Sequence, residues 1–142
     1  MKDYLLKCFP RLLAVLGCST LVTACYGTPY DSYDAMITGT VLDAETDRPV
    51  PGISVRITAG YRSQGSGNTI QSLVPTDDVR ESLTDYNGRF QEYIHSYREP
   101  DGIIFECLDV DGEENGAYSP KSQVYQITEI NDVKISLDKI QD

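Results

Sequence analysis

The chain has 142 residues with a formal net charge of −10, and this length suits a single domain behind an export signal. Three of the 12 basic residues but only one of the 22 acidic residues lie in the first 24 positions, so the remainder carries a net charge of −12. A body this acidic is repelled by phosphate backbones, which argues against nucleic-acid binding.

The first 24 residues have the features of a secretory signal peptide. Lys2, Lys7 and Arg11 form a positively charged start. Residues 12–22 form an apolar stretch that is too short to span a bilayer as a mature helix. This stretch has no amphipathic spacing and is soon followed by glycine and proline, so a core helix is the weaker interpretation.

The segment Val22-Thr23-Ala24-Cys25 resembles the lipobox of bacterial lipoproteins. The resemblance implies cleavage before Cys25, diacylglycerol on its thiol, and an acyl chain such as palmitate on the new amino terminus. Several chains on one residue form a stable membrane anchor. Cleavage at Cys18, cleavage without lipid, and an uncleaved anchor remain as alternatives. Because residue 26 is not the aspartate associated with inner-membrane retention, we expect the outer membrane, with the protein facing the periplasm or the cell surface.

Residues 25–35 are expected to form a short tether, and residues 36–142 one β-sandwich domain. Apolar residues alternate in short runs between turn signals, with no sustained helical period. The expected strands cover residues 36–43, 53–57, 70–74, 79–84, 89–94, 102–109, 124–128 and 133–137. Residues 75–78 are expected to end an edge strand. The pattern predicts an all-β fold, a single antiparallel sandwich of about seven strands.

Three stretches in this region resemble the carboxypeptidase-regulatory-like, or transthyretin-like (prealbumin-like), sandwich modules. The family pattern is a G-x-V strand, a P-I-x-G-x-x-V turn and strand, and a T-D-x-x-G-x-F hairpin. The chain matches it at residues 37–43, 49–57 and 84–90. Aspartate and glycine would turn the hairpin, and Phe90 would fill the space between the sheets. These modules accompany catalytic domains rather than perform catalysis, so the resemblance implies a non-catalytic unit.

A second resemblance covers residues 25–30 and 109–116. These segments are similar to lipoproteins associated with radical SAM enzymes in Gram-negative anaerobes, a group named by its genetic neighbourhood and without an established activity. The resemblance supports the fold and the location. It also implies an alternative role, in which the chain is a substrate or accessory protein of a radical SAM modifying enzyme.

An acidic loop near the end of the domain is the candidate metal site. Oxygen ligands at alternating positions suit a hard cation such as Ca²⁺, and the candidates are Asp109, Asp111, Glu113 and Asn115. The loop departs from an EF-hand, because Glu114 replaces the turning glycine and Pro120 the final glutamate. A solvated acidic hairpin is therefore the competing interpretation, and no other cofactor is expected.

Four tyrosines are candidates for contact with a protein or glycan partner, because aromatic faces bind sugars and peptides. They are Tyr61, Tyr93, Tyr97 and Tyr118. Tyrosine also suits half-buried strand positions, which is the structural alternative.

No enzyme is expected from this sequence. The single histidine, His95, could act as a base for Ser82 or Ser96, but no nucleophile elbow and no zinc-binding motif accompanies it. Cys107 lies in an apolar run and is expected to be a buried thiol. The sequence thus favours a membrane-anchored lipoprotein with a non-catalytic binding or structural module.

Overall fold

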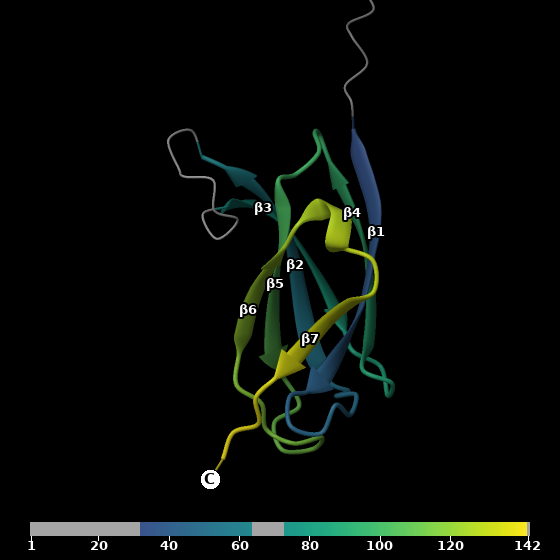
Figure 1. Cartoon of the computed structure of the whole chain (residues 1–142), viewed down its shortest axis with the longest axis vertical. Helices are drawn as coiled ribbons and strands as arrows, with labels where there is room; N and C mark the ends of the chain where they lie inside the picture. Colours follow the sequence, from purple (N-terminus) through teal and green to yellow (C-terminus); the bar gives the residue numbers. More distant parts are fainter. Residues whose placement is uncertain (1–31, 64–72, 142) are drawn as a thin grey trace, which may run out of the picture. The chain divides into compact units, whose positions relative to one another are not determined.

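The computed structural model describes residues 32–63 and 73–141. Within these ranges the chain is a sandwich of two sheets (Figure 1), which confirms the predicted all-β class. The strands are β1 (Tyr33–Asp43), β2 (Ile53–Arg62), β3 (Leu73–Leu83), β4 (Arg89–Ser96), β5 (Gly102–Asp109), β6 (Lys121–Tyr125) and β7 (Val133–Leu137), with a 3₁₀ turn, η2 (Ile127–Glu129). The expected signal peptide and Cys25 lie outside the described residues. In the described part, no helix is long and apolar enough to cross a membrane.

One sheet has the strand order β4-β1-β7 and the other has the order β3-β2-β5-β6. All neighbouring strands are antiparallel except β1 and β7, which run parallel from the pair Gly39 and Val133 to the pair Asp43 and Leu137. The expectation of a wholly antiparallel sandwich is therefore wrong at this pair. A tight hairpin forces two strands to be antiparallel, whereas β7 follows β6 of the other sheet through η2, so no hairpin links it to β1.

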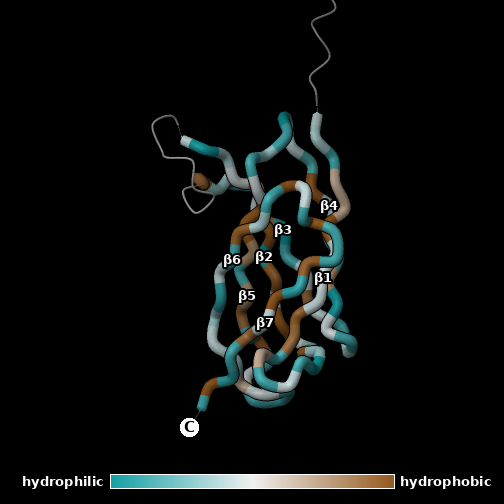
Figure 2. The backbone as a smooth tube through the Cα atoms, in the orientation of Figure 1, coloured by the Kyte–Doolittle hydropathy of each residue, from teal (hydrophilic) through white to brown (hydrophobic). Residues whose placement is uncertain are grey.

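The core lies between the two sheets, and strand alternation builds it. Most of the alternate residues along β1, β2, β5 and β7 that are buried between the sheets are apolar, and Figure 2 shows the hydrophobic residues of these strands. Eight of these side chains have an exposed fraction of 0%: Ile37, Val41, Ile53, Val55, Ile57, Ile103, Phe105 and Ile135. Burial of each such side chain contributes roughly 1.5–3 kcal/mol, which makes this layer the main source of stability.

The predicted hairpin turn joins β3 to β4. The Asp85 carboxylate accepts hydrogen bonds from the backbone N–H groups of Asn87 and Arg89, each at 2.9 Å. Gly88 has a φ of +68°, and a Cβ there would lie 2.6 Å from the Val41 carbonyl oxygen. Glycine is therefore required both by the turn and by the close approach of β1.

Phe90 connects the two sheets, as the sequence predicted. It is 3% exposed, and its ring centroid lies 6.0 Å from that of Phe105 in the opposite sheet. Phe90 lies directly opposite Gly39 in the pair of β1 and β4. A Cβ at Gly39 would lie 2.4 Å from Cζ of Phe90. The ring thus occupies the space that a side chain at position 39 would need.

β3 differs from the sequence-based expectation of two short strands separated at residues 75–78. It is one strand, in which Pro75 pairs with Gly60 and residues 76–78 face Ala59 alone. The predicted break is a β-bulge, which bends a strand without ending it. Proline is tolerated because β3 is at the edge of its sheet, where a missing N–H costs no ladder bond.

β6 also differs from its prediction, because it covers residues 121–125 rather than 124–128. Backbone pairing with β5 sets this boundary. β6 pairs with β5 from Lys121, opposite Cys107, to Tyr125, opposite Ile103. The apolar residue Ile127, which extended the predicted strand, lies in η2 instead.

Candidate functional site

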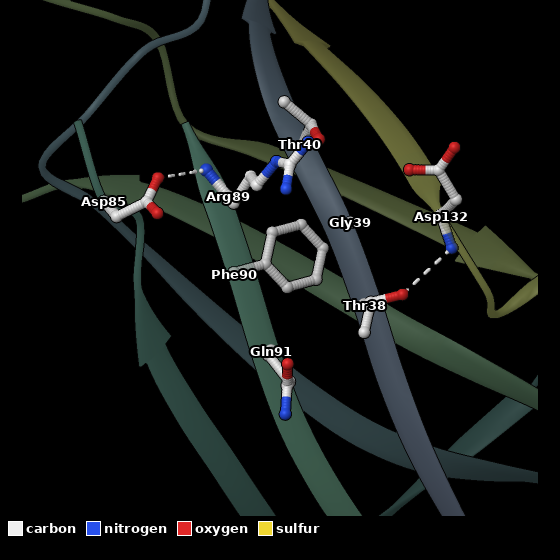
Figure 3. Close-up of a pocket in the computed structure, with 8 residues that line it drawn as sticks. All are labelled: Thr38, Gly39, Thr40, Asp85, Arg89, Phe90, Gln91 and Asp132. Carbon is white, nitrogen blue, oxygen red and sulfur yellow. Dashed lines mark hydrogen bonds between the residues drawn. The ribbon is translucent and has the colours of Figure 1, made fainter. Parts of the chain in front are cut away.

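A polar hollow of about 440 Å³ lies over the pair of β1 and β4 on the sheet face that points away from the core (Figure 3). Most of the polar residues that line it are alternate residues of β1 and β4, whose side chains point to the outer face of the sheet. Thr38 and Thr40 alternate with core residues of β1, and they lie opposite Gln91 and Arg89 of β4, respectively. The hairpin residue Asp85 and the residue before β7, Asp132, complete the polar lining. These six residues form the polar hollow.

Few contacts within the chain engage the side chains of the polar hollow. The Thr38 hydroxyl accepts a hydrogen bond from the Asp132 backbone N–H at 3.1 Å. Asp132 has a φ of +58°, a left-handed conformation that is uncommon outside glycine. Within residues 32–63 and 73–141, no ion pair or side-chain hydrogen bond engages the Arg89 guanidinium or the Gln91 amide. These groups are available to a ligand.

A second polar cluster lies further along the same face, where β1 begins. Oδ1 of Asp34 accepts a hydrogen bond from the Tyr93 hydroxyl at 2.6 Å and lies 2.6 Å from Nδ1 of His95. The hydrogen bond from Tyr93, and then that from His95, lowers the pKa of Asp34. The same hydrogen bond to Asp34 raises the pKa of Tyr93. The cluster fixes the first residues of β1 against β4.

His95 has no serine partner in the described part of the chain. The His95 side chain points outward and is 51% exposed, whereas Ser96, the next residue of the strand, points the other way and contacts the hydroxyl of Tyr61 in the opposite sheet. The Ser82 hydroxyl donates to the Gln91 carbonyl at 3.2 Å. The arrangement lacks the pairing of nucleophile and base that serine hydrolysis requires.

The four candidate tyrosines are not brought together at one site. Tyr93 and Tyr97 are 49% and 80% exposed. The Tyr61 ring lies under the Arg98 guanidinium at 4.2 Å, and its hydroxyl donates to the Arg98 carbonyl at 3.1 Å. Tyr118 is 6% exposed, so its ring belongs to the core and is not accessible to a partner.

Tyr118 is held by a hydrogen bond from its hydroxyl to the Asp43 carboxylate at 3.0 Å. Burial, followed by this hydrogen bond, raises the pKa of Tyr118 to about 12. The phenol therefore stays protonated at neutral pH and acts as a structural donor.

Two carboxylates of the acidic loop, those of Asp109 and Asp111, accept hydrogen bonds from the chain itself. Asp109 accepts hydrogen bonds from the backbone N–H groups of Gly112 at 3.1 Å and Tyr118 at 2.8 Å, one on each oxygen. Asp111 accepts one from the Asn115 amide. Among the described residues, no group of three or more His, Cys, Asp or Glu side chains is placed to hold a metal ion. Glu113 is exposed. The geometry describes an acidic hairpin, and the Ca²⁺ site stays a prediction.

Cys107 is a buried thiol, as the sequence predicted. It is 1% exposed, and burial raises its pKa to about 12. Because the thiolate is the reactive form, this thiol is inert at neutral pH.

Sequence reasoning missed the polar hollow and the Asp34 cluster. The alternation of β1 places Thr38 and Thr40 on one face, and this was visible in the sequence. The sequence carries no signal that β1 pairs with β4, and that pairing brings Arg89 and Gln91 beside them. Asp132 is about 90 residues from Thr38 in the chain, and only the parallel β7 places it here.

No protein-family model and no curated protein sequence matches this chain. Among solved structures, it is similar to the C-terminal domain of the shaft pilin SpaA from Lactobacillus rhamnosus GG, with 11% sequence identity and a TM-score of 0.43. The match covers 76% of this chain and 99% of that domain. Its own strand pairing makes the described part of the chain a seven-stranded β-sandwich.

Proposed function

We propose that this protein is a lipid-anchored, non-catalytic binding module of the bacterial cell envelope. The observation that carries the proposal is the lipobox-like segment ending at Cys25, followed closely by a sandwich whose first strand begins at Tyr33. A chain spans at most about 3.6 Å per residue. The eight steps from Cys25 to Tyr33 would therefore keep the start of β1 within about 30 Å of the lipid.

The arrangement of the polar side chains supports a binding role over catalysis. His95 is paired with Asp34 on the outer face, and the described serines nearest to it in the chain are engaged elsewhere. The polar hollow offers unengaged donors and acceptors without a pair of nucleophile and base. Such a surface recognises a molecule without transforming it.

The negative charge of the sandwich supports membrane attachment through lipid rather than through electrostatic attraction. The chain after residue 24 carries a net charge of −12, and anionic lipid surfaces repel it. Attachment to the membrane must then come from acyl chains on Cys25, since electrostatic attraction would need the opposite sign. The outer membrane remains the proposed location.

Metabolic labelling with an alkyne-bearing palmitate tests the anchor. The full chain should incorporate the label, and Cys25→Ala should abolish it. Cys18→Ala is the matched control, because it removes the other cysteine near the predicted cleavage site and should leave labelling unchanged. An unlabelled wild-type chain, or loss of label in Cys18→Ala alone, would overturn the assignment of Cys25.

A second candidate function is that of a substrate or accessory protein of a radical SAM modifying enzyme. Its support is the resemblance at residues 25–30 and 109–116. The second segment includes an exposed loop with Glu113 and Glu114 at the surface, where an enzyme could reach it. Intact-mass measurement of the native protein tests this role. A mass equal to that of the sequence plus its lipid would rule out a modified substrate.

A further inference from the structure

The polar hollow presents both hydrogen-bond donors and hydrogen-bond acceptors to solvent. Arg89 contributes a guanidinium and Gln91 an amide, while Asp132 contributes a carboxylate. Asp85 uses Oδ1 for two backbone N–H groups, which leaves its second oxygen. Neighbouring hydroxyls of a sugar ring donate and accept at once, so they match a mixed set of this kind.

The charges in the polar hollow select against charged occupants. One guanidinium stands against the two carboxylates of Asp85 and Asp132, within a domain that is itself strongly acidic. An anionic ligand would be repelled by both carboxylates and by the surrounding field. An apolar peptide would leave the polar groups unpaired, which is costly. A neutral, hydroxyl-rich molecule satisfies these groups without either penalty.

An aromatic surface adjoins the polar hollow on the same sheet face. The pair of Tyr93 and Met36 is the next outward-facing pair along β4 and β1 after Gln91 and Thr38. Tyr93 is 49% exposed and Met36 is 45% exposed. The Tyr93 hydroxyl is fixed to Asp34 on the neighbouring strand, so the ring extends across the two strands. A fixed aromatic ring beside polar groups can pack against the apolar face of a sugar ring.

We propose that the outer face of the pair β1 and β4 binds a neutral saccharide. Hydroxyls of one sugar unit occupy the polar hollow, and an adjacent unit packs on Tyr93. A volume of about 440 Å³ is within the roughly 300–1,000 Å³ of small-molecule sites. The inference rests on the proposed role as a binding module and specifies its ligand. It does not depend on the lipid anchor.

A glycan array, followed by titration calorimetry, tests the proposal with the native protein purified in detergent micelles. The array carries neutral oligosaccharides and, for comparison, glycans rich in uronic or sialic acid. Binding is expected to neutral oligosaccharides. For the best of them, Arg89→Ala and Gln91→Ala should each weaken the affinity by about tenfold or more.

Arg56→Ala is the matched control, because Arg56 is a half-buried arginine on the other sheet, whose guanidinium lies 3.6 Å from the Glu106 carboxylate. It should leave the affinity within about twofold of the wild type. Tyr93→Ala tests the aromatic surface and should also weaken binding. If Arg89→Ala unfolds, Gln91→Ala tests the polar hollow instead, since the exposed Gln91 amide has no hydrogen-bond partner among the described residues.

Three results would overturn the proposal. They are the absence of binding to any neutral oligosaccharide on the array, binding confined to acidic glycans, and an equal loss of affinity in Arg56→Ala and Arg89→Ala. None of them affects the palmitate labelling of Cys25, so failure of the ligand assignment is distinguishable from failure of the anchor.

Discussion

The Thr84 hydroxyl links the turn before β2 to the hairpin. The hydroxyl accepts a hydrogen bond from the Ile53 backbone N–H and donates one to the Val50 carbonyl, each at 2.9 Å. Thr84 is 4% exposed, so water cannot replace these bonds. The threonine of the T-D-x-x-G-x-F pattern therefore fastens the start of β2 to the hairpin, while the aspartate beside it forms the turn.

Thr84→Val keeps the shape of the side chain and removes its hydroxyl. The free energy of unfolding should fall by about 1–3 kcal/mol, because two buried backbone groups lose their partner. Urea denaturation measures the change. Thr128→Val, at an exposed position of η2, is the control and should change stability by less than about 0.5 kcal/mol. Equal losses in the two variants would contradict the role of the buried bonds.

The Asp43 carboxylate closes the turn that follows β1. It accepts hydrogen bonds from the backbone N–H groups of Glu45 at 2.9 Å and Thr46 at 3.0 Å, and from the Tyr118 hydroxyl. The N–H of Thr46, and then that of Glu45, lowers the pKa of Asp43 below its ordinary value of 3.8. The folded chain thus favours the charged form. This stabilisation is present above pH 3.8 and is lost as the pH falls through the lowered pKa.

Asp43→Asn removes the charge and keeps one acceptor oxygen. The wild type should exceed the variant in free energy of unfolding at pH 6, and the gap should narrow as the pH is lowered from about 4 to about 2. Thermal unfolding of both proteins across this range measures the gap. A gap that stays constant or widens on acidification would show that the Asp43 charge does not stabilise the fold.

In the pair of β1 and β4, Gly39, which has no side chain, lies opposite the large ring of Phe90. Phe90 covers Gly39, and a Cβ at position 39 would also lie 2.6 Å from the Val133 carbonyl oxygen on the other side. Gly39 is therefore enclosed between β4 and β7. This close packing holds the floor of the polar hollow in place, because Gly39 and Phe90 both line it.

Gly39→Ala should lower the free energy of unfolding by about 1–3 kcal/mol, because the new methyl group overlaps the ring and a backbone carbonyl. In a Phe90→Leu background the cost of the same substitution should be smaller, since the ring is gone. Chemical denaturation of the four proteins gives the coupling, expected at about 0.5 kcal/mol or more. Additive effects would mean that Phe90 does not restrict position 39.

Strand alternation was sufficient to predict most elements, and pairing explains where it failed. The inward face of β1 and the hairpin before Phe90 followed from short-range patterns. The bulge at residues 76–78 did not follow from such patterns. Pro75 and the two aspartates after it have the composition of a turn, and only the pairing of β3 at the edge of its sheet shows that the strand continues. The parallel β7 depends on a crossing between sheets that no local pattern encodes.

The candidate site was predicted less well than the fold, because its residues are distant in sequence. Residue type alone predicts the tyrosines as binding residues, and Tyr118 is buried. Spacing alone predicts the acidic loop as a metal site, yet its Asp109 is engaged by backbone N–H groups. Arg89 and Thr40 occupy positions of the family pattern where any residue is allowed, and only the register of β1 and β4 brings them together.

The whole molecule combines an acidic domain with an expected hydrophobic anchor. A net charge of −12 after residue 24 keeps the domain away from anionic surfaces. The proposed lipid would then supply the attachment to the membrane. An anchor of this kind holds the sandwich near the membrane while both of its outer faces remain able to meet a ligand.

Salt should not release the protein from isolated membranes. At about 1 M salt, charge interactions are screened beyond roughly 3 Å, whereas acyl-chain insertion persists. The protein should remain in the membrane pellet after a wash with high salt and move to the supernatant in nonionic detergent. Release by salt alone would point to an electrostatic attachment to another envelope component.

The mass of the intact mature protein tests the lipid anchor most directly. We expect a chain that begins at Cys25 and carries the added mass of a diacylglyceryl group and one acyl chain on that residue. Fragmentation should place all of the added mass on the first residue. A chain that retains its first 24 residues, or one that begins at Cys25 without lipid, would contradict the proposed lipid anchor.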